Sequence, residues 1–204
     1  RAVHPLFTLL YPEVSERVTQ SILNAYDESG FMPEWASPGH RECMIGNNSI
    51  SLLTDAWMKG IRTICPEKAL EAMIHQTEAR HPGISSVGRD GFGYYDRLGY
   101  VPYPEVHEAT AKTLEYAYAD WCVARFADSI GRKEIADTYY RKALNYRNLY
   151  YPDYGFMWAK DANGKWRDAF DATEWGGPFT EGSSWHWTWS VLHDPEGLSR
   201  LMGG

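Results

Sequence analysis

Apolar residues recur at helical spacing through most of the chain, which predicts a mainly α-helical protein. Apolar positions three and four residues apart predict a helix over residues 12–29, and Gly30 can end it in a left-handed conformation. The same spacing predicts helices over 48–64 and 66–80, the latter opened by a proline in its first turn. Because the connection between these two helices is very short, we expect an αα-hairpin.

The longest predicted helix covers residues 107–130, where few positions are plainly polar and Gly131 can form the C-cap. A helix that is apolar nearly all round is buried on two sides, which suits the inner layer of a two-layer helical barrel. The following segment, 132–149, alternates apolar and charged positions as an outer helix does. These patterns predict an all-α fold of helical hairpins, with inner and outer layers alternating.

After Pro152 the pattern changes from helical to extended. The turn sequence Asp161-Ala162-Asn163-Gly164 lies between two short apolar runs, and Asn-Gly is a strong hairpin signal. This predicts a small β-hairpin near residues 155–168. A helix over 183–193 is predicted next, and Asp194-Pro195 ends it. The glycines of residues 88–95 are predicted to form a loop and lack the strand and helix of a dinucleotide fingerprint, which argues against a nucleotide site.

Composition narrows the partners that the chain can bind. Its 204 residues suffice for one globular domain, and its net charge of -7 without a basic run argues against nucleic acid. No apolar stretch of about 18 residues and no signal-peptide core are present, so no membrane segment is predicted. Cys43, Cys65 and Cys122 share no metal-ligand spacing, and we expect them to be buried thiols.

One carboxylate, Glu181, stands in a dense group of aromatic residues over 179–189. Aromatic faces stack on pyranose rings, and a carboxylic acid that rings shield from water can stay protonated and protonate a glycosidic oxygen. Glu181 is therefore the first candidate for a catalytic acid at a sugar site. The alternative is that the tryptophans are core residues and that Glu181 lies at the start of a helix; local sequence leaves both open.

Three further residues are candidates for a sugar site. Glu34 and Trp35 lie in a loop broken by Pro33 and can line a groove, although Trp35 can instead simply cover a helix end. Glu115 follows Leu114 in the longest predicted helix, and a buried carboxylate must be paired, hydrogen-bonded or functional. A site role and a structural ion pair both stay open for Glu115.

Six segments together resemble family 92 of the glycoside hydrolases. They are residues 1–6 (RAVHPL), 44–47 (MIGN), 98–102 (LGYVP), 113–118 (TLEYAY), 146–149 (YRNL) and 179–182 (FTEG). The resemblance covers essentially the whole chain, in order. It implies a calcium-dependent, exo-acting, inverting α-mannosidase whose (α/α)6 catalytic barrel packs against an N-terminal β-sandwich. The rival functions are an (α/α)6 glycosidase for another α-linked sugar and a non-catalytic, carbohydrate-binding helical scaffold.

The resemblance also implies roles for particular residues. Glu181, in the Thr-Glu-Gly segment, matches the general acid, and Glu115, Trp185 and His186 would lie near the sugar. The family often has Gln at the position of His186, so the contacts of that residue differ from the family pattern.

The resemblance further implies that residues 1–204 are the central portion of the catalytic domain. The segments that carry the general base and the main calcium ligand would lie beyond Arg1 and Gly204, as would the β-sandwich and the C-terminal part of the barrel. We therefore expect no metal ligands in this chain, calcium as the cofactor of the intact parent, and a mannose-containing glycan as its partner. We expect the parent to be secreted or periplasmic.

Overall fold

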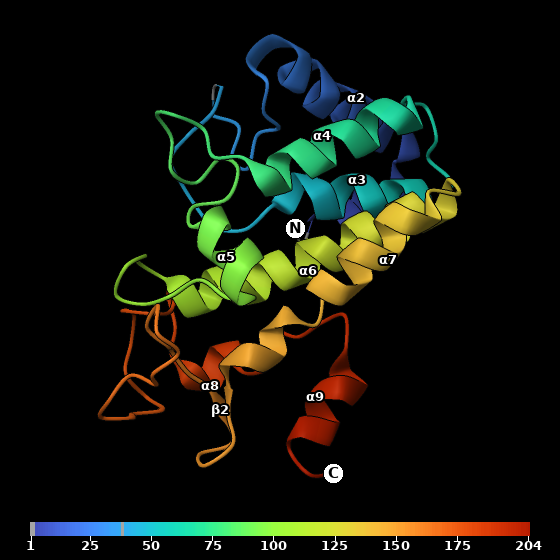
Figure 1. The fold of residues 1–204 in the computed structure, drawn as a ribbon. Coiled ribbons are helices and arrows are strands. Elements are labelled where there is room, and N and C mark those ends of the chain that lie inside the picture. The colour runs from blue at the N-terminus through green and yellow to red at the C-terminus, as the bar shows by residue number, and fades with distance from the viewer. Residues whose placement is uncertain (1–2, 38) are drawn as a thin grey trace. The chain divides into compact units, whose positions relative to one another are not determined.

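The computed structural model describes residues 3–37 and 39–204. Arg1 and Ala2, which belong to the segment 1–6 named above, and Pro38 lie outside the described residues. Helices make up most of the fold (Figure 1). They are α1 (Val3–Leu10), α2 (Pro12–Ser29), α3 (Asn48–Met58), α4 (Pro66–Glu78), α5 (Phe92–Leu98), α6 (Ala109–Ser129), α7 (Lys133–Lys142), the 3-10 helix η1 (Asn145–Leu149), α8 (Ser184–Trp187) and α9 (Pro195–Leu201). Strands β1 (Tyr150–Tyr151) and β2 (Phe156–Met157) pair antiparallel.

The chain forms two compact units, and α6 contributes to both. The first unit comprises the residues up to Asp90 together with Ala119–Tyr140, and the second comprises Gly91–Tyr118 together with Arg141–Gly204. No helix in residues 3–37 and 39–204 is long and apolar enough to cross a membrane.

In the first unit, α2 packs against α1, α3 and α4. The C-terminal half of α6 contacts α3 through Trp57, whose indole packs against Phe126 at a ring-centroid distance of 5.2 Å and donates to the Ser129 hydroxyl at 2.9 Å. The hydroxyl groups of Thr77 on α4 and Tyr139 on α7 lie 2.7 Å apart. Helices distant in sequence are thus joined by buried polar contacts as well as by apolar packing.

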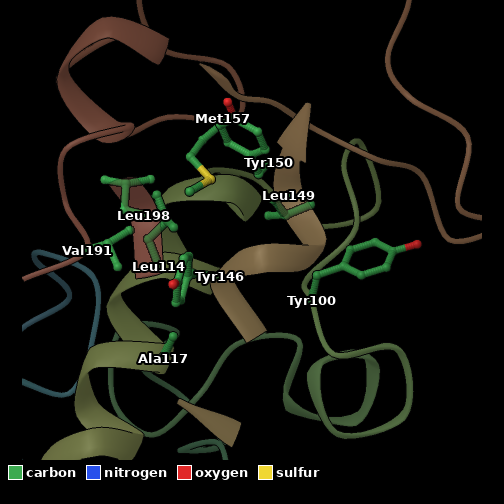
Figure 2. Close-up of a cluster of buried hydrophobic side chains, with 9 residues drawn as sticks. All are labelled: Tyr100, Leu114, Ala117, Tyr146, Leu149, Tyr150, Met157, Val191 and Leu198. Atoms are coloured by element: carbon green, nitrogen blue, oxygen red, sulfur yellow. The ribbon is translucent and has the colours of Figure 1, made fainter. Parts of the chain in front are cut away.

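In the second unit, the N-terminal half of α6 has apolar side chains on two faces. Figure 2 shows the larger cluster, which gathers Tyr100, Leu114, Ala117, Tyr146, Leu149, Tyr150, Met157, Val191 and Leu198. A second cluster holds Tyr95, Val101, Val106, Ala109 and Tyr116. Because α6 supplies side chains to both clusters, the prediction of a helix buried on two sides is confirmed.

Glycines with positive φ set several of the helix ends. Gly30 and Gly131, each with φ 79°, follow α2 and α6 at the predicted positions. The helix predicted over 48–64 ends instead at Met58, because Gly60 takes φ 93° and turns the chain. The link to α4 is therefore residues 59–65, longer than predicted. The helix predicted over 132–149 ends at Lys142, and the chain continues as η1.

The β-hairpin lies where it was predicted, but an isolated bridge joins its two arms in place of a strand ladder. Lys160 and Trp166 form a single antiparallel bridge around a turn in which Gly164 has φ 84°. Strand β2 pairs with β1, which directly follows the segment predicted as a helix over 132–149 and was not predicted as a strand.

Other helices also differ from the prediction. The helix predicted over 183–193 is only the four-residue α8, and Asp194 begins a further helix because its carboxylate accepts from the Gly197 amide at 2.9 Å. The prediction missed α1, and α5 occupies part of the segment predicted as a glycine-rich loop.

The three cysteines are free thiols in unlike surroundings. Cys122 is buried, Cys43 is half-buried and Cys65 is exposed. The prediction of buried thiols is therefore wrong for Cys65, which precedes the first turn of α4.

Candidate active site

Glu181 is exposed and lies on a loop whose backbone is held on both sides. The Gly176 amide donates to the Gly182 carbonyl at 2.8 Å, which closes the loop across Glu181. Phe179 is 1% exposed and packs against Trp158 with ring centroids 6.0 Å apart. The backbone that presents the carboxylate to solvent is therefore fixed by a hydrogen bond and by the core.

Glu181 itself adopts a backbone conformation that non-glycine residues seldom take. Its φ is 46°, in the left-handed region. Such a conformation costs about 1–3 kcal/mol and persists only where surrounding contacts enforce it, which is common at functional sites. The loop contacts therefore maintain a strained residue at the position that sequence analysis assigned to the catalytic acid.

Helix α8, directly after Glu181, is held at its start and along its length. The Ser183 amide donates to Nδ1 of His186 at 3.1 Å, so this nitrogen is an acceptor and the neutral ring carries its proton on Nε2. The Ser184 hydroxyl donates to the Met157 carbonyl, and the Met157 amide donates to the Thr188 hydroxyl at 2.9 Å. Strand β2 therefore fixes the helix that follows the candidate acid.

Aromatic rings flank this segment. Trp185 is 52% exposed and meets Phe156 edge to face with ring centroids 4.8 Å apart. Trp175 is 66% exposed and meets His186 in the same manner at 5.6 Å. The predicted site residues Glu181, Trp185 and His186 thus share one short, rigid segment. In the part of the chain that the structure describes, these rings leave Glu181 exposed, so shielding of its carboxylate in the intact parent stays a prediction.

Glu115 lies on α6 in the same unit and is half-buried. Its neighbour Leu114 belongs to the cluster in Figure 2, and Tyr116 belongs to the other apolar cluster. Successive helical residues differ by about 100° around the axis, so Glu115 lies on neither apolar face. A role near the sugar stays a prediction for this residue.

Glu34 and Trp35 belong to the first unit, where the Glu34 carboxylate is surrounded by donors. Its oxygens accept from Nε2 of Gln76 at 2.8 Å, from the Ser49 amide at 3.2 Å and from Nδ2 of Asn47 at 3.5 Å. Burial raises the pKa of Glu34 to about 7, although these donors favour the charged form. Glu34 thus joins its loop to the first turn of α3 and to α4, while Trp35 remains 46% exposed.

A buried ion pair extends this network and was missed by sequence reasoning. Arg89 donates through Nε to Oδ1 of Asn47 at 2.7 Å, and its Nη2 lies 2.8 Å from Oδ1 of Asp120. The Arg89 and Asp120 side chains are 1% and 0% exposed. The sequence feature that could have revealed this pair is Asp120 itself. It lies in a nearly apolar helix, and a fully buried carboxylate requires a partner.

The three acidic residues that most closely precede Glu181 in sequence all have partners. Glu174 receives both arms of the Arg167 guanidinium at 2.7 and 2.8 Å. The amide and hydroxyl of Thr173 donate to Asp171, and these bonds lower its pKa despite the opposing effect of desolvation. Asp168 pairs with Lys165 at 2.9 Å on the surface. Glu174 and Asp171 therefore act first as loop-forming groups.

Comparison with known proteins assigns the whole chain to one family. The model of the glycosyl hydrolase family 92 catalytic domain matches residues 1–204. The structure of a family GH92 inverting mannosidase from Bacteroides thetaiotaomicron is 84% identical, with a TM-score of 0.98 over 99% of this chain and 27% of the other. A GH92 α-mannosidase of the same organism, in complex with mannoimidazole, is 30% identical, with a TM-score of 0.84 over 98% of this chain and 28% of the other.

A curated relative from Arthroderma benhamiae is described as an uncharacterized secreted glycosidase. It is 26% identical over 90% of this chain and 28% of its own length. The chain thus spans little more than a quarter of the relatives it matches.

The chain belongs to glycosyl hydrolase family 92, within the catalytic domain. Its all-α fold class, as part of an (α/α)6 barrel, is confirmed by the family match and by the solved relatives.

Proposed function

We propose that the intact protein containing this chain removes terminal α-linked mannose from glycans by inverting acid/base hydrolysis. The observation that carries the proposal is Glu181, which the chain presents on a rigid, left-handed turn beside exposed tryptophans. Similarity to an inverting mannosidase and to an α-mannosidase bound to mannoimidazole supports mannose as the sugar. Similarity to a secreted glycosidase supports a secreted or periplasmic parent.

In this proposal Glu181 protonates the glycosidic oxygen as the bond to the sugar breaks. Trp185 offers an exposed indole face on which a pyranose can stack, and His186 holds the start of α8 while facing Trp175. We assign Glu115 to the residues that bind the sugar. Trp35 is a second exposed ring available to sugar, and Glu34 supports the loop that carries it.

The proposal places residues 1–204 in the middle of a longer catalytic domain, without its β-sandwich and the rest of its barrel. An inverting glycosidase needs a second carboxylate about 6.5–9.5 Å from the acid to activate water. Asp171 and Glu174 already have loop-forming partners, so we assign the base to a part of the parent outside this chain.

Calcium is assigned to the intact parent on the family resemblance alone. Calcium takes about six to eight oxygen ligands. Within residues 3–37 and 39–204, no group of three or more His, Cys, Asp or Glu side chains could hold a metal ion. No step of the proposed reaction is derived from the ion.

Substitution of the acid tests the proposal in the intact protein. Glu181→Gln should lower turnover of mannosides with poor leaving groups, which need protonation, and spare those with very good leaving groups. Asp168→Asn removes an exposed carboxylate nearby, 84% exposed, and serves as the control for charge. Equal loss on both substrate types in Glu181→Gln would count against the acid role. Mannose binding by calorimetry without turnover in the unmodified protein would favour the carbohydrate-binding scaffold.

The fragment assignment has a separate test. Residues 1–204, purified alone, should hydrolyse no α-mannoside with or without millimolar calcium. Turnover that disappears in Glu181→Gln would show that a base lies within these residues. A panel of aryl α-glycosides on the intact protein distinguishes mannose from another α-linked sugar.

A further inference from the structure

The indole of Trp187 hydrogen-bonds to the backbone before Glu181 and lies next to Gly182, the residue after it. Its Nε1–H donates to the Thr180 carbonyl at 2.8 Å, and this carbonyl belongs to the peptide group that precedes Glu181. A Cβ built on Gly182 would lie 3.2 Å from Nε1 and 3.3 Å from Cδ1 of the same indole. Trp187 therefore binds the residue before Glu181 and occupies the space that a side chain at the residue after it would need.

These contacts bear directly on the left-handed conformation of Glu181. The angle φ of a residue is set by the orientation of its preceding peptide plane, and the Trp187 hydrogen bond fixes that plane at Thr180. The Gly176 amide, bound to the Gly182 carbonyl at 2.8 Å, fixes the chain on the other side. With both sides fixed, Glu181 is held at φ 46°.

Trp187 is itself held firmly. Its ring is half-buried against the apolar cluster shown in Figure 2, which includes Met157 and Leu198. Helix α8 is held to β2 through Ser184 and Thr188. The indole thus connects the core of the second unit to the Glu181 turn.

We infer that Trp187 is a positioning residue for the acid: its indole holds the Thr180–Gly182 backbone so that the Glu181 carboxylate is presented in one fixed place. The inference rests on the proposed function, in which Glu181 is the acid. It assigns Trp187 no contact with the sugar or with the reacting atoms.

Trp187→Phe in the intact enzyme removes the N–H donor and keeps an aromatic ring. Because small displacements of a catalytic group can cost about 100-fold, kcat/KM on mannosides with poor leaving groups should fall about 10- to 100-fold. On very good leaving groups it should fall less than about threefold, since these need little protonation. Equal losses on both substrate types, or none on either, would overturn the positioning role.

Trp57→Phe is the matched control. It also removes a buried indole donor, the bond to Ser129 at 2.9 Å, but in the first unit. It should lower the melting temperature without any dependence on leaving group. If Trp57→Phe gave the same leaving-group dependence as Trp187→Phe, general destabilisation would explain both results and the inference would be wrong.

Two further variants keep the test decisive. Gly182→Ala presses a methyl group against the indole and against Cβ of His186, and it should show the same leaving-group dependence even if Trp187→Phe does not fold. Adding Trp187→Phe to Glu181→Gln should cause little further loss, because no acid remains to be positioned; a full additive loss would overturn the inference. If Glu181→Gln itself shows no leaving-group dependence, the acid role fails, and the positioning role fails with it.

Discussion

Glu34 in the first unit and Glu181 in the second are both candidates for the sugar site, but they have opposite surroundings. Glu34 is enclosed by Gln76, Asn47 and the amide of Ser49, and burial raises its pKa to about 7. Glu181 is exposed, and the contacts around it reach its backbone. One glutamate is fixed by its carboxylate, whereas the other is fixed by its main chain.

This difference indicates that Glu34 has a structural role and that Glu181 is free to meet a substrate. A carboxylate whose oxygens accept three hydrogen bonds has little capacity left for a ligand, and it stabilises the segments that supply the donors. A carboxylate on a rigid backbone with an exposed side chain can meet a substrate without first breaking contacts. The comparison therefore favours Glu181 for chemistry and Glu34 for the support of its loop.

The largest expected effect is on catalysis. Glu181→Gln in the intact enzyme should lower turnover of poor leaving groups about 10²- to 10⁴-fold, the usual contribution of a general acid. Glu34→Gln should change turnover only a few-fold and equally for both leaving-group types, because Glu34 acts through its loop. Steady-state kinetics on the two substrate types measure both effects. A leaving-group dependence in Glu34→Gln would contradict the comparison.

The next effect is on stability and concerns the ion pair linked to Glu34 through Asn47. Asp120→Asn leaves Arg89 charged, buried and without its carboxylate, which should lower the free energy of unfolding by about 3–5 kcal/mol. Asp128→Asn breaks the more exposed pair with Lys133, which water and salt screen, and should cost much less. Denaturant titration of the intact protein compares the two variants. Similar losses in both would show that burial does not set the strength of these pairs.

Periodicity predicted the long helices well because burial of one face dominates their formation. Residues 12–29 match α2, and the nearly apolar 107–130 contains α6. The prediction failed where a single glycine outweighed the pattern, as at Gly60. It also failed for the short helix α5, whose seven residues give too little repeat to detect.

The candidate site was predictable only in part. Glu181, Trp185 and His186 are near one another in sequence, so local composition could find them. Arg89 and Asp120 are far apart in sequence, and their pairing depends on how α6 packs in the first unit. The role proposed for Trp187 depends on the direction of one indole N–H, which residue spacing does not encode.

A smaller effect is expected on the pH dependence of the free energy of unfolding, through Glu34. The folded-state pKa of Glu34, about 7, lies above its ordinary value of 4.5, so between these values folded Glu34 keeps a proton that the unfolded chain has lost. Stability should therefore fall as pH rises through this window, by about 3 kcal/mol at most. Asn47 and Gln76 do not titrate, and Arg89 keeps its charge throughout.

Unfolding free energies from pH 4.5 to 8 measure this contribution as the difference between the intact protein and Glu34→Gln. Glu28→Gln, an exposed carboxylate on α2, is the control and should leave the slope unchanged. A wild-type slope no steeper than that of Glu34→Gln would show that Glu34 is charged throughout and that its donors outweigh its burial.

The smallest effect on stability is expected at Thr180, which directly precedes Glu181. Within the part of the chain that the structure describes, its hydroxyl oxygen is buried and has no hydrogen-bond partner. Thr180→Val replaces that hydroxyl with a methyl group of similar size and keeps the carbonyl that binds Trp187, so stability should change by less than about 1 kcal/mol or rise slightly.

Ser184→Ala is the comparison variant. It should cost about 1–3 kcal/mol, because it leaves the buried Met157 carbonyl without its donor. Thermal unfolding and the leaving-group assay on the intact enzyme test the pair. A large loss of activity in Thr180→Val with unchanged stability would show that this hydroxyl binds the substrate or a water in the working site, and that side-chain contacts as well as the backbone fix the surroundings of Glu181.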